Sequence, residues 1–173
     1  RLRPARLLCL MQLSWCVLPI VVAALATAVP ARAEELALRA PVPSRILLDL
    51  QRREISVVLD GRMRGSWPVA IGDPKPPTPQ GGFAILRKEV NPIYVSNKSG
   101  QRKELSGPTS PIGDRYLAFH RNGRGEFGIH GTPWPHWVKI RAAVSLGCVR
   151  MLNDHVRELF DLVDVGTSLE IRG

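Results

Sequence analysis

The chain has 173 residues, of which 45% are hydrophobic and 23% charged, and its formal net charge is +9. This length is sufficient for one domain with its own hydrophobic core. The basic residues are scattered and do not form a stripe interleaved with aromatic residues, which argues against a nucleic-acid-binding protein. We interpret the positive charge as a solvated surface with a modest attraction to anionic polymers.

The N-terminal segment predicts export. Three arginines within the first six residues precede an apolar run from Leu7 to Val29, and the run is followed by the sequence Ala31-Arg32-Ala33. This order is typical of a secretory signal peptide that is cleaved after Ala33. An uncleaved membrane anchor is the alternative, because the run is nearly long enough to span a bilayer. We therefore expect residues 1–33 to be a signal peptide and the protein to reach the periplasm or cell envelope.

Cleavage would leave 140 residues with a net charge of +5, because the leader holds four basic residues and no acidic ones. Residues 34–44 are polar and contain prolines, and we interpret them as a linker to a domain that spans residues 45–173. Hydrophobic alternation over residues 46–50 and 55–59 predicts two strands of a β-meander. Asp60-Gly61 supplies the turn of its second hairpin.

The middle of the chain alternates loops and strands. Residues 73–82, "DPKPPTPQGG", contain too many prolines for regular structure and predict a loop. A strand is expected from Phe83 until Asn91-Pro92 stops it. The polar stretch 95–111 contains glycine and proline and is long enough to cover a cleft, so we expect it to act as a mobile lid.

The last third predicts two strands, one helix and a final strand. "RYLAFH" and "EFGIHG" are the two strands, joined by the turn "RNGRG". The residues at helical spacing are Val156, Leu159, Phe160 and Val163. Asn153 or Asp154 is the candidate N-cap, and Gly166 the candidate end of the helix before a strand over residues 168–171. The domain is thus expected to be mainly β.

Cys148 is the one cysteine outside the predicted signal peptide. Exported proteins normally pair their cysteines, so an unpaired one is either a small buried hydrophobic residue or a reactive thiol. A thiol attacks as the thiolate, and a neighbouring imidazole raises the thiolate fraction. His130 ends a predicted strand and is followed by Gly131, where the chain can bend tightly. Gly147 lets backbone N–H groups approach a substrate carbonyl, as stabilisation of an oxyanion requires.

These residues belong to a pattern that resembles the L,D-transpeptidase catalytic domain of the YkuD type, also described as the ErfK/YbiS/YcfS/YnhG type. The family signature is His, a spacer, Ser or Thr, His, Gly and Cys. The matching pieces, in family order, are "TPQGGFAI" (78–85), "NPIY" (91–94), "SPIGDRYLAF" (110–119), "IHGT" (129–132) and "SLGCVRM" (145–151). The resemblance covers residues 45–173 and implies a mixed β-sandwich that is mainly β with one or two helices.

The resemblance implies an enzyme that acts on peptidoglycan stem peptides as donor and acceptor. Such an enzyme cleaves the bond before the terminal D-Ala of a donor tetrapeptide and holds the acyl group on its cysteine as a thioester. It then transfers the acyl group to an amine, which gives a 3→3 cross-link or a bond to another acceptor. With water as acceptor the same site is an L,D-carboxypeptidase. Carbapenem-type inhibitors are expected to acylate Cys148, and no cofactor, metal, nucleic acid or obligate protein partner is implied.

Four site residues carry the chemistry implied by the resemblance. Cys148 is the nucleophile, and His130 accepts its proton and then donates it to the leaving amine. The Gly131 carbonyl holds the second imidazole nitrogen. The backbone N–H groups of Gly147 and Cys148 stabilise the oxyanion.

Five further residues are expected around the substrate. Arg150 suits a substrate carboxylate, and Tyr94 stands where the family has Trp in Asn-Pro-x-Trp. Ser145 either orders the loop or is a turn-forming serine. Trp134 stacks on sugar rings, lines the acceptor side of the cleft or packs in the core. Leu146 replaces the usual His, and we expect it to alter groove polarity and acceptor preference more than the chemistry.

Three alternatives lead to other classes of protein. A zinc site would need ligands at closer spacing than His120, His130 and His136 provide. A non-catalytic wall-binding module would use "PWPHW" (133–137) as a platform for carbohydrate. A papain-like hydrolase would place the cysteine before the histidine, whereas here His130 precedes Cys148.

Overall fold

The computed structural model describes residues 43–97 and 100–173. The expected signal peptide and all but the last two residues of the expected linker lie outside the described residues. Across the described ranges, no helix combines the length and apolar character needed to cross a membrane.

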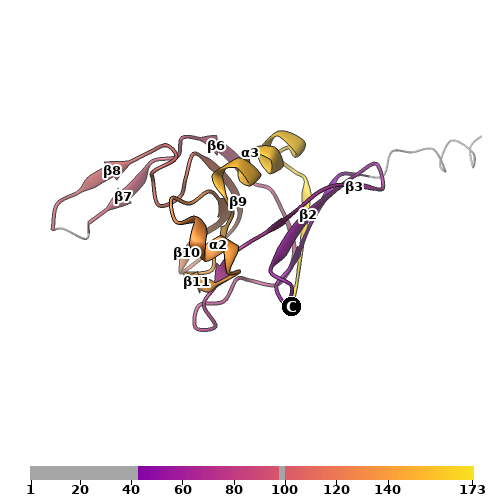
Figure 1. The fold of residues 1–173 in the computed structure, drawn as a ribbon, viewed down its shortest axis with the longest axis horizontal. Coiled ribbons are helices and arrows are strands. Elements are labelled where there is room, and N and C mark those ends of the chain that lie inside the picture. Colours follow the sequence, from indigo (N-terminus) through magenta and orange to yellow (C-terminus); the bar gives the residue numbers. More distant parts are fainter. Residues whose placement is uncertain (1–42, 98–99) are drawn as a thin grey trace, which may run out of the picture. The chain divides into compact units, whose positions relative to one another are not determined.

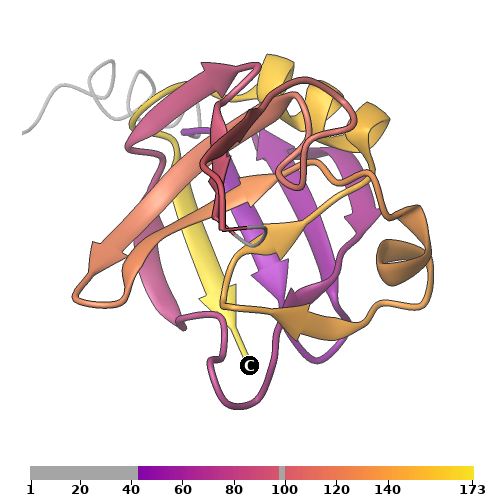
Figure 2. The same ribbon diagram turned by 90° about the vertical axis from the view of Figure 1, so that its left-hand side faces the viewer.

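The first sheet has five strands in the order β3-β2-β1-β13-β5. Their bounds are β1 (Arg45–Asp49), β2 (Glu54–Leu59), β3 (Arg62–Pro68), β5 (Gly81–Ala84) and β13 (Ser168–Arg172). β1 to β3 form the predicted meander, and Asp60 and Gly61 both adopt positive φ at its second turn. β13 pairs parallel with β1 and antiparallel with β5, so the last strand lies between the indigo and magenta strands of Figure 2.

The second sheet has four strands in the order β12-β10-β9-β6. They are β6 (Arg87–Val90), β9 (Arg115–Asn122), β10 (Gly125–His130) and β12 (Val149–Arg150). β9 and β10 form the predicted antiparallel hairpin, whereas β12 joins β10 in parallel. This parallel pairing brings two segments that are distant in the sequence to the same edge of the sheet.

Two small pairs complete the strands. β4 (Ile71–Gly72) pairs parallel with β11 (Ala143–Ser145), and β7 (Tyr94–Ser96) pairs antiparallel with β8 (Lys103–Leu105). The β7–β8 hairpin projects away from the two sheets in Figure 1. The stretch 95–111, expected to be a polar lid, thus begins as a β-hairpin and continues as turns.

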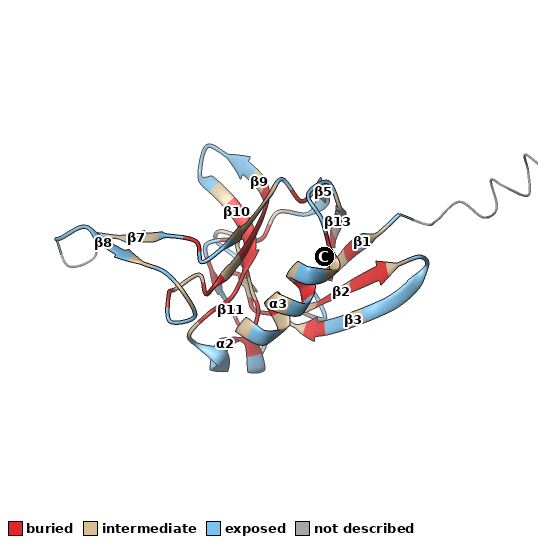
Figure 3. Cartoon of the chain, turned by 90° about the horizontal axis from the view of Figure 1, so that it is seen from above, coloured by how far each residue is buried: buried red, intermediate tan, exposed pale blue. Residues whose placement is uncertain are grey.

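One cluster of buried side chains joins both sheets and a helix. It includes Ile46 and Ile171 from the first sheet, Leu117 and Ile129 from the second, and Leu159 from helix α3 (Asn153–Leu162). In Figure 3 the buried residues follow the strands of both sheets, while β7 and β8 are intermediate or exposed. Burial of such side chains is the main stabilising contribution to the fold.

The helices differ from the sequence expectation in three respects. A second, short helix α2 (Pro135–Lys139) forms within "PWPHW", and a proline suits the first turn of a helix. α3 begins at Asn153 with Leu152 as N-cap and no side-chain cap, so the expected Asx cap is wrong. It ends at Leu162, and Gly166, with φ of 91°, lies in the turn that follows. The Asn153 side chain bonds to two other segments and is not available to the helix end.

Candidate active site

The parallel pairing of β10 and β12 brings the histidine and the cysteine together. His130 is the last residue of β10 and stands opposite Arg150 in the register, and Cys148 directly precedes β12. The Met151 N–H donates to the His130 carbonyl at 2.9 Å, which fixes this register just beyond the strand end. Cys148, His130 and Arg150 line one cavity of about 430 Å³.

His130 is buried in a defined orientation. The residue is only 4% exposed, and its Nδ1 lies 2.6 Å from the Gly131 carbonyl oxygen. A carbonyl can only accept, so the proton lies on Nδ1 and Nε2 is left as the acceptor. Tyr116 stacks on the imidazole with the ring centroids 6.0 Å apart and an interplanar angle of 11°. The ring is therefore held at one edge by a hydrogen bond and on one face by an aromatic ring.

Burial disfavours charge on both reacting groups. It lowers the pKa of His130 to about 4, and Arg150 adds to this effect while the Gly131 hydrogen bond opposes it. Burial also raises the pKa of the Cys148 thiol, against smaller opposite effects of a Gly128 backbone hydrogen bond and Arg150. The sequence led us to expect that a neighbouring imidazole raises the thiolate fraction of Cys148. Burial acts against this, because it favours the neutral form of both groups.

The loop before the cysteine requires glycine and is closed by serine. Gly147 has φ of 109°, and a Cβ at this position would lie 2.5 Å from the Phe127 ring. Ser145 is buried, its Oγ accepts from the Gly147 N–H at 3.1 Å, and it donates to the Cys148 carbonyl at 2.5 Å. Ser145 thus orders this loop. Because the Gly147 N–H is engaged in this way, the Cys148 N–H is the better candidate for an oxyanion donor.

Arg150 and Trp134 form one wall of the cavity. The Arg150 guanidinium lies 5.8 Å from the Trp134 ring centroid, and its buried Nε has no hydrogen-bond partner among the described residues. Trp134 is 41% exposed and lines the cavity, so it does not pack in the core. Tyr94 of β7 and Leu105 of β8 also line the cavity. Leu146 also lines the cavity and is 83% exposed, so its side chain adds an apolar group at the mouth of the cavity.

A second cavity of about 290 Å³ also reaches Cys148. It is lined by Tyr116 and Glu126 together with Arg87, which pairs with Glu126 at 2.7 Å. Burial raises the pKa of the Tyr116 phenol, as do Cys148 and a hydrogen bond with Glu126, so the hydroxyl remains protonated. The sequence interpretation missed Tyr116 and Glu126. The β9–β10 register places Tyr116 opposite His130, and the Glu126 carbonyl oxygen lies 3.9 Å from Cys148 Sγ, and neither contact has a local sequence pattern.

The other histidines lie apart from this arrangement. His120 packs between Phe83 and Phe127, with ring centroids 5.2 and 5.6 Å away. The ring centroids of His136 and Trp137 in α2 lie 4.5 Å apart in a tilted arrangement, with an interplanar angle of 43°. Across residues 43–97 and 100–173, no three His, Cys, Asp or Glu side chains are grouped as a metal site would require.

Comparison with known proteins gives a consistent family. The family model for the L,D-transpeptidase catalytic domain, YkuD, matches residues 43–171. YqjB of Bacillus subtilis is 34% identical over 130 residues, which cover 73% of this chain and 69% of YqjB.

Two solved structures share the fold. The L,D-transpeptidase from Mycobacterium smegmatis superposes with a TM-score of 0.61 at 24% identity, covering 75% of this chain and 58% of that one. L,D-transpeptidase 3 from Mycobacterium tuberculosis, in complex with a faropenem-derived adduct, has a TM-score of 0.60 at 21% identity and covers 75% and 60%. This chain thus spans about three fifths of either structure, and the likeness confirms the mainly β fold with two short helices. From its match to the family model and its relatives, the chain belongs to the YkuD family of L,D-transpeptidase catalytic domains.

Proposed function

We propose that the protein is a peptidoglycan L,D-transpeptidase that works through an acyl-enzyme on Cys148. The observation that carries this proposal is the β10–β12 register, which sets His130 opposite Arg150 and places Cys148 in the same cavity. A nucleophile, an oriented base and a cation for a carboxylate are the groups that this reaction needs.

The first half-reaction forms a thioester and releases D-Ala. Cys148 Sγ attacks the carbonyl of the third residue of the donor stem while its proton passes to His130 Nε2. The oxyanion of the tetrahedral intermediate accepts a hydrogen bond from the Cys148 N–H. The intermediate then collapses, the C–N bond breaks, and the imidazolium returns its proton to the leaving amine of D-Ala.

The second half-reaction returns the enzyme to its resting state. The amine of the acceptor attacks the thioester carbonyl and gives one proton to His130. The C–S bond breaks, and the leaving sulfur takes that proton to restore the thiol. Both residues are neutral before and after this sequence, in agreement with the lowered pKa of His130 and the raised pKa of Cys148.

In this proposal, the proton transfers decide which part of each substrate occupies which of the two cavities. The leaving amine and the acceptor amine both exchange a proton with His130, so both occupy the cavity that contains His130 and Arg150. Arg150 takes the D-Ala carboxylate through its guanidinium, whose buried Nε has no hydrogen-bond partner within residues 43–97 and 100–173. The acyl part of the donor then extends into the second cavity, beside Tyr116 and Glu126.

The proposal extends to inhibitors and to location. A faropenem-derived adduct occurs on the tuberculosis enzyme of the same fold, which supports acylation of Cys148 by carbapenems and related compounds here. We further propose that the protein acts outside the cytoplasmic membrane, where peptidoglycan stem peptides lie and where the signal-like residues 1–33 would direct it.

The test is the mass spectrum of muropeptides after purified sacculi are incubated with the protein. We expect 3→3 cross-linked dimers and free D-Ala, and neither with Cys148→Ala. Tripeptide stems without dimers would instead show an L,D-carboxypeptidase. Unchanged muropeptides, with the protein bound to the sacculi, would show a binding module and contradict the proposal.

A further inference from the structure

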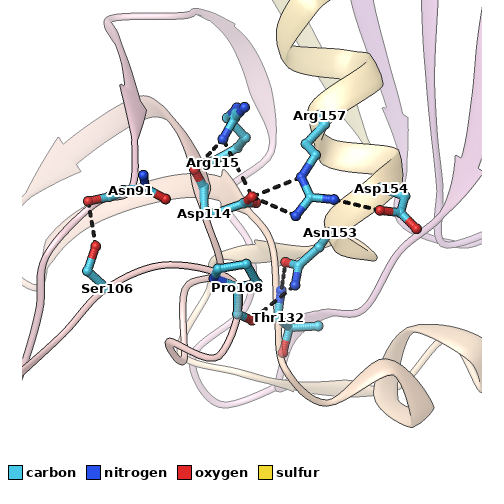
Figure 4. A network of polar contacts seen from close by, with 9 residues as sticks. All are labelled: Asn91, Ser106, Pro108, Asp114, Arg115, Thr132, Asn153, Asp154 and Arg157. Atoms are coloured by element: carbon cyan, nitrogen blue, oxygen red, sulfur yellow. Dashed lines mark hydrogen bonds and ion pairs between the residues drawn. The ribbon is translucent and has the colours of Figure 1, made fainter.

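The Asn153 side chain joins two backbone segments that border the active site. Its Oδ1 accepts a hydrogen bond from the Thr132 N–H at 3.0 Å, and its Nδ2 donates to the Pro108 carbonyl at 3.0 Å. Figure 4 shows the amide between these two segments, at the start of α3. One segment follows His130 directly, and the other leads to Pro111 and Ile112 in the cavity lining.

Two glycines make room for this amide. A Cβ at Gly131 would lie 2.1 Å from Asn153 Oδ1, and a Cβ at Gly113 would lie 2.5 Å from it. Gly113 also has φ of 63°, a conformation that glycine adopts readily. The Gly131 carbonyl is the group that fixes the His130 tautomer. The Gly131 peptide is therefore held between the imidazole on one side and the Asn153 amide on the other.

The start of α3 is itself anchored. Arg157, one turn further along the helix, donates to the Asp114 carboxylate from Nε at 2.8 Å and from Nη2 at 2.7 Å, and it reaches Asp154 at 2.7 Å. The Asp114 carbonyl accepts from the Asn91 N–H at 2.9 Å. The Arg157 contacts, drawn in Figure 4, tie the helix to the start of β9, so Asn153 projects from a fixed base.

We propose that Asn153 is a positioning residue that sets the orientation of His130 and the cavity wall at residues 108–112 with a single amide group. The inference rests on the proposed function, because it concerns the same base and the same cavity. An amide is required because the position needs an acceptor for Thr132 and a donor for Pro108 at once. A carboxylate offers only the acceptor, and alanine offers neither.

This difference separates the two roles by substitution. Asn153→Ala frees the Thr132 N–H and lets the Gly131 peptide rotate, so the imidazole loses the carbonyl that selects its tautomer. Asn153→Asp keeps the acceptor for Thr132, but sets a carboxylate against the Pro108 carbonyl and displaces the wall. A carboxylate in the first turn of α3 interacts favourably with the helix dipole, so Asn153→Asp is expected to fold.

The experiment combines imidazole NMR with acylation kinetics on the full chain. Two-bond proton–nitrogen correlation spectra report the tautomer of His130, and intact-mass spectrometry with imipenem reports the rate of acylation. Wild type should show the Nδ1–H tautomer. Asn153→Ala should lose it and acylate on the order of tenfold more slowly or worse, as expected for a misplaced base. Asn153→Asp should keep the tautomer and still acylate slowly.

Ser106→Ala is the matched control, because it removes another hydrogen bond of the same region, from Ser106 Oγ to the Asn91 carbonyl at 2.8 Å. It should leave the tautomer unchanged. If Ser106→Ala changed the His130 tautomer as much as Asn153→Ala does, the change would reflect general loosening of the region and would overturn the proposal. Wild-type tautomer and rate in a folded Asn153→Ala would also overturn it. If Asn153→Ala does not fold, a wild-type acylation rate in Asn153→Asp overturns it.

Failure of the proposed function has a different outcome. If wild type does not react with imipenem, the transpeptidase proposal is at fault. The tautomer difference between wild type and Asn153→Ala still tests the positioning role in that case, since it requires no substrate.

Discussion

At the scale of single residues, Cys148 and His130 line one cavity, and their reactivity depends on geometry. Burial opposes the thiolate and the imidazolium alike, so in the proposed reaction proton transfer accompanies attack on the substrate. The Gly131 carbonyl and the Tyr116 ring hold the imidazole so that Nε2 is the free acceptor. Reactivity should therefore be sensitive to groups that orient the ring without taking part in the chemistry.

Tyr116 gives a direct test of this dependence. Tyr116→Phe keeps the ring that stacks on His130, and we expect acylation by imipenem to remain within a few-fold of wild type. Tyr116→Leu removes the stacking surface and should slow acylation on the order of tenfold. Stopped-flow or intact-mass kinetics would measure both. Equal rates for Phe and Leu would show that the stack does not orient the base.

The lowered pKa of His130 also predicts how stability depends on pH. The unfolded chain binds a proton near the ordinary pKa of 6.5, whereas the folded chain does so only near 4. Stability is therefore complete above pH 6.5 and falls as the pH drops towards 4, by up to about 3 kcal/mol. Urea unfolding at several pH values would measure this loss. His130→Gln should lose less stability over the same range, and an unchanged pH dependence in that variant would contradict the burial argument.

At the scale of elements, the sequence predicts those parts that depend on local pattern. Alternating hydrophobic residues and the Asp60-Gly61 turn predict the meander β1 to β3, and hydrophobic residues at helical spacing predict α3. The structure confirms both. The two-residue strands β4 and β12 have no local pattern, because pairing with distant segments alone defines them. The Asn153 amide could not be assigned either, since its partners lie 21 and 45 residues away.

The β7–β8 hairpin is the element expected to select the donor. Tyr94 stands opposite Leu105 in its register and lines both cavities, including the smaller one proposed above for the acyl part of the donor. Replacing the hairpin by a short turn should expose Cys148, so iodoacetamide should alkylate it faster while discrimination between donor stem peptides falls. Competition between two tetrapeptides that differ in the third residue would measure this discrimination. Donor preference identical to wild type would show that the hairpin is not a selective wall.

At the scale of the whole molecule, the site depends on one core built from both ends of the described chain. β13 pairs with β1, and their inward side chains Ile46, Leu48, Leu169 and Ile171 join the cluster that supports β9 and β10. The family and the fold could be predicted from sequence, because the family's motifs occur in the expected order along nearly the whole domain. The protonation state of the pair could not be predicted, since it depends on burial that only the folded chain creates.

The central claim is that His130 activates Cys148 for acyl transfer, and intact-mass spectrometry with imipenem tests it most directly. We expect a covalent adduct on wild type that maps to the peptide containing Cys148, none on Cys148→Ala, and an adduct formed at least about a hundredfold more slowly on His130→Ala. Absence of any adduct on folded wild type, or equal rates for wild type and His130→Ala, would contradict the account.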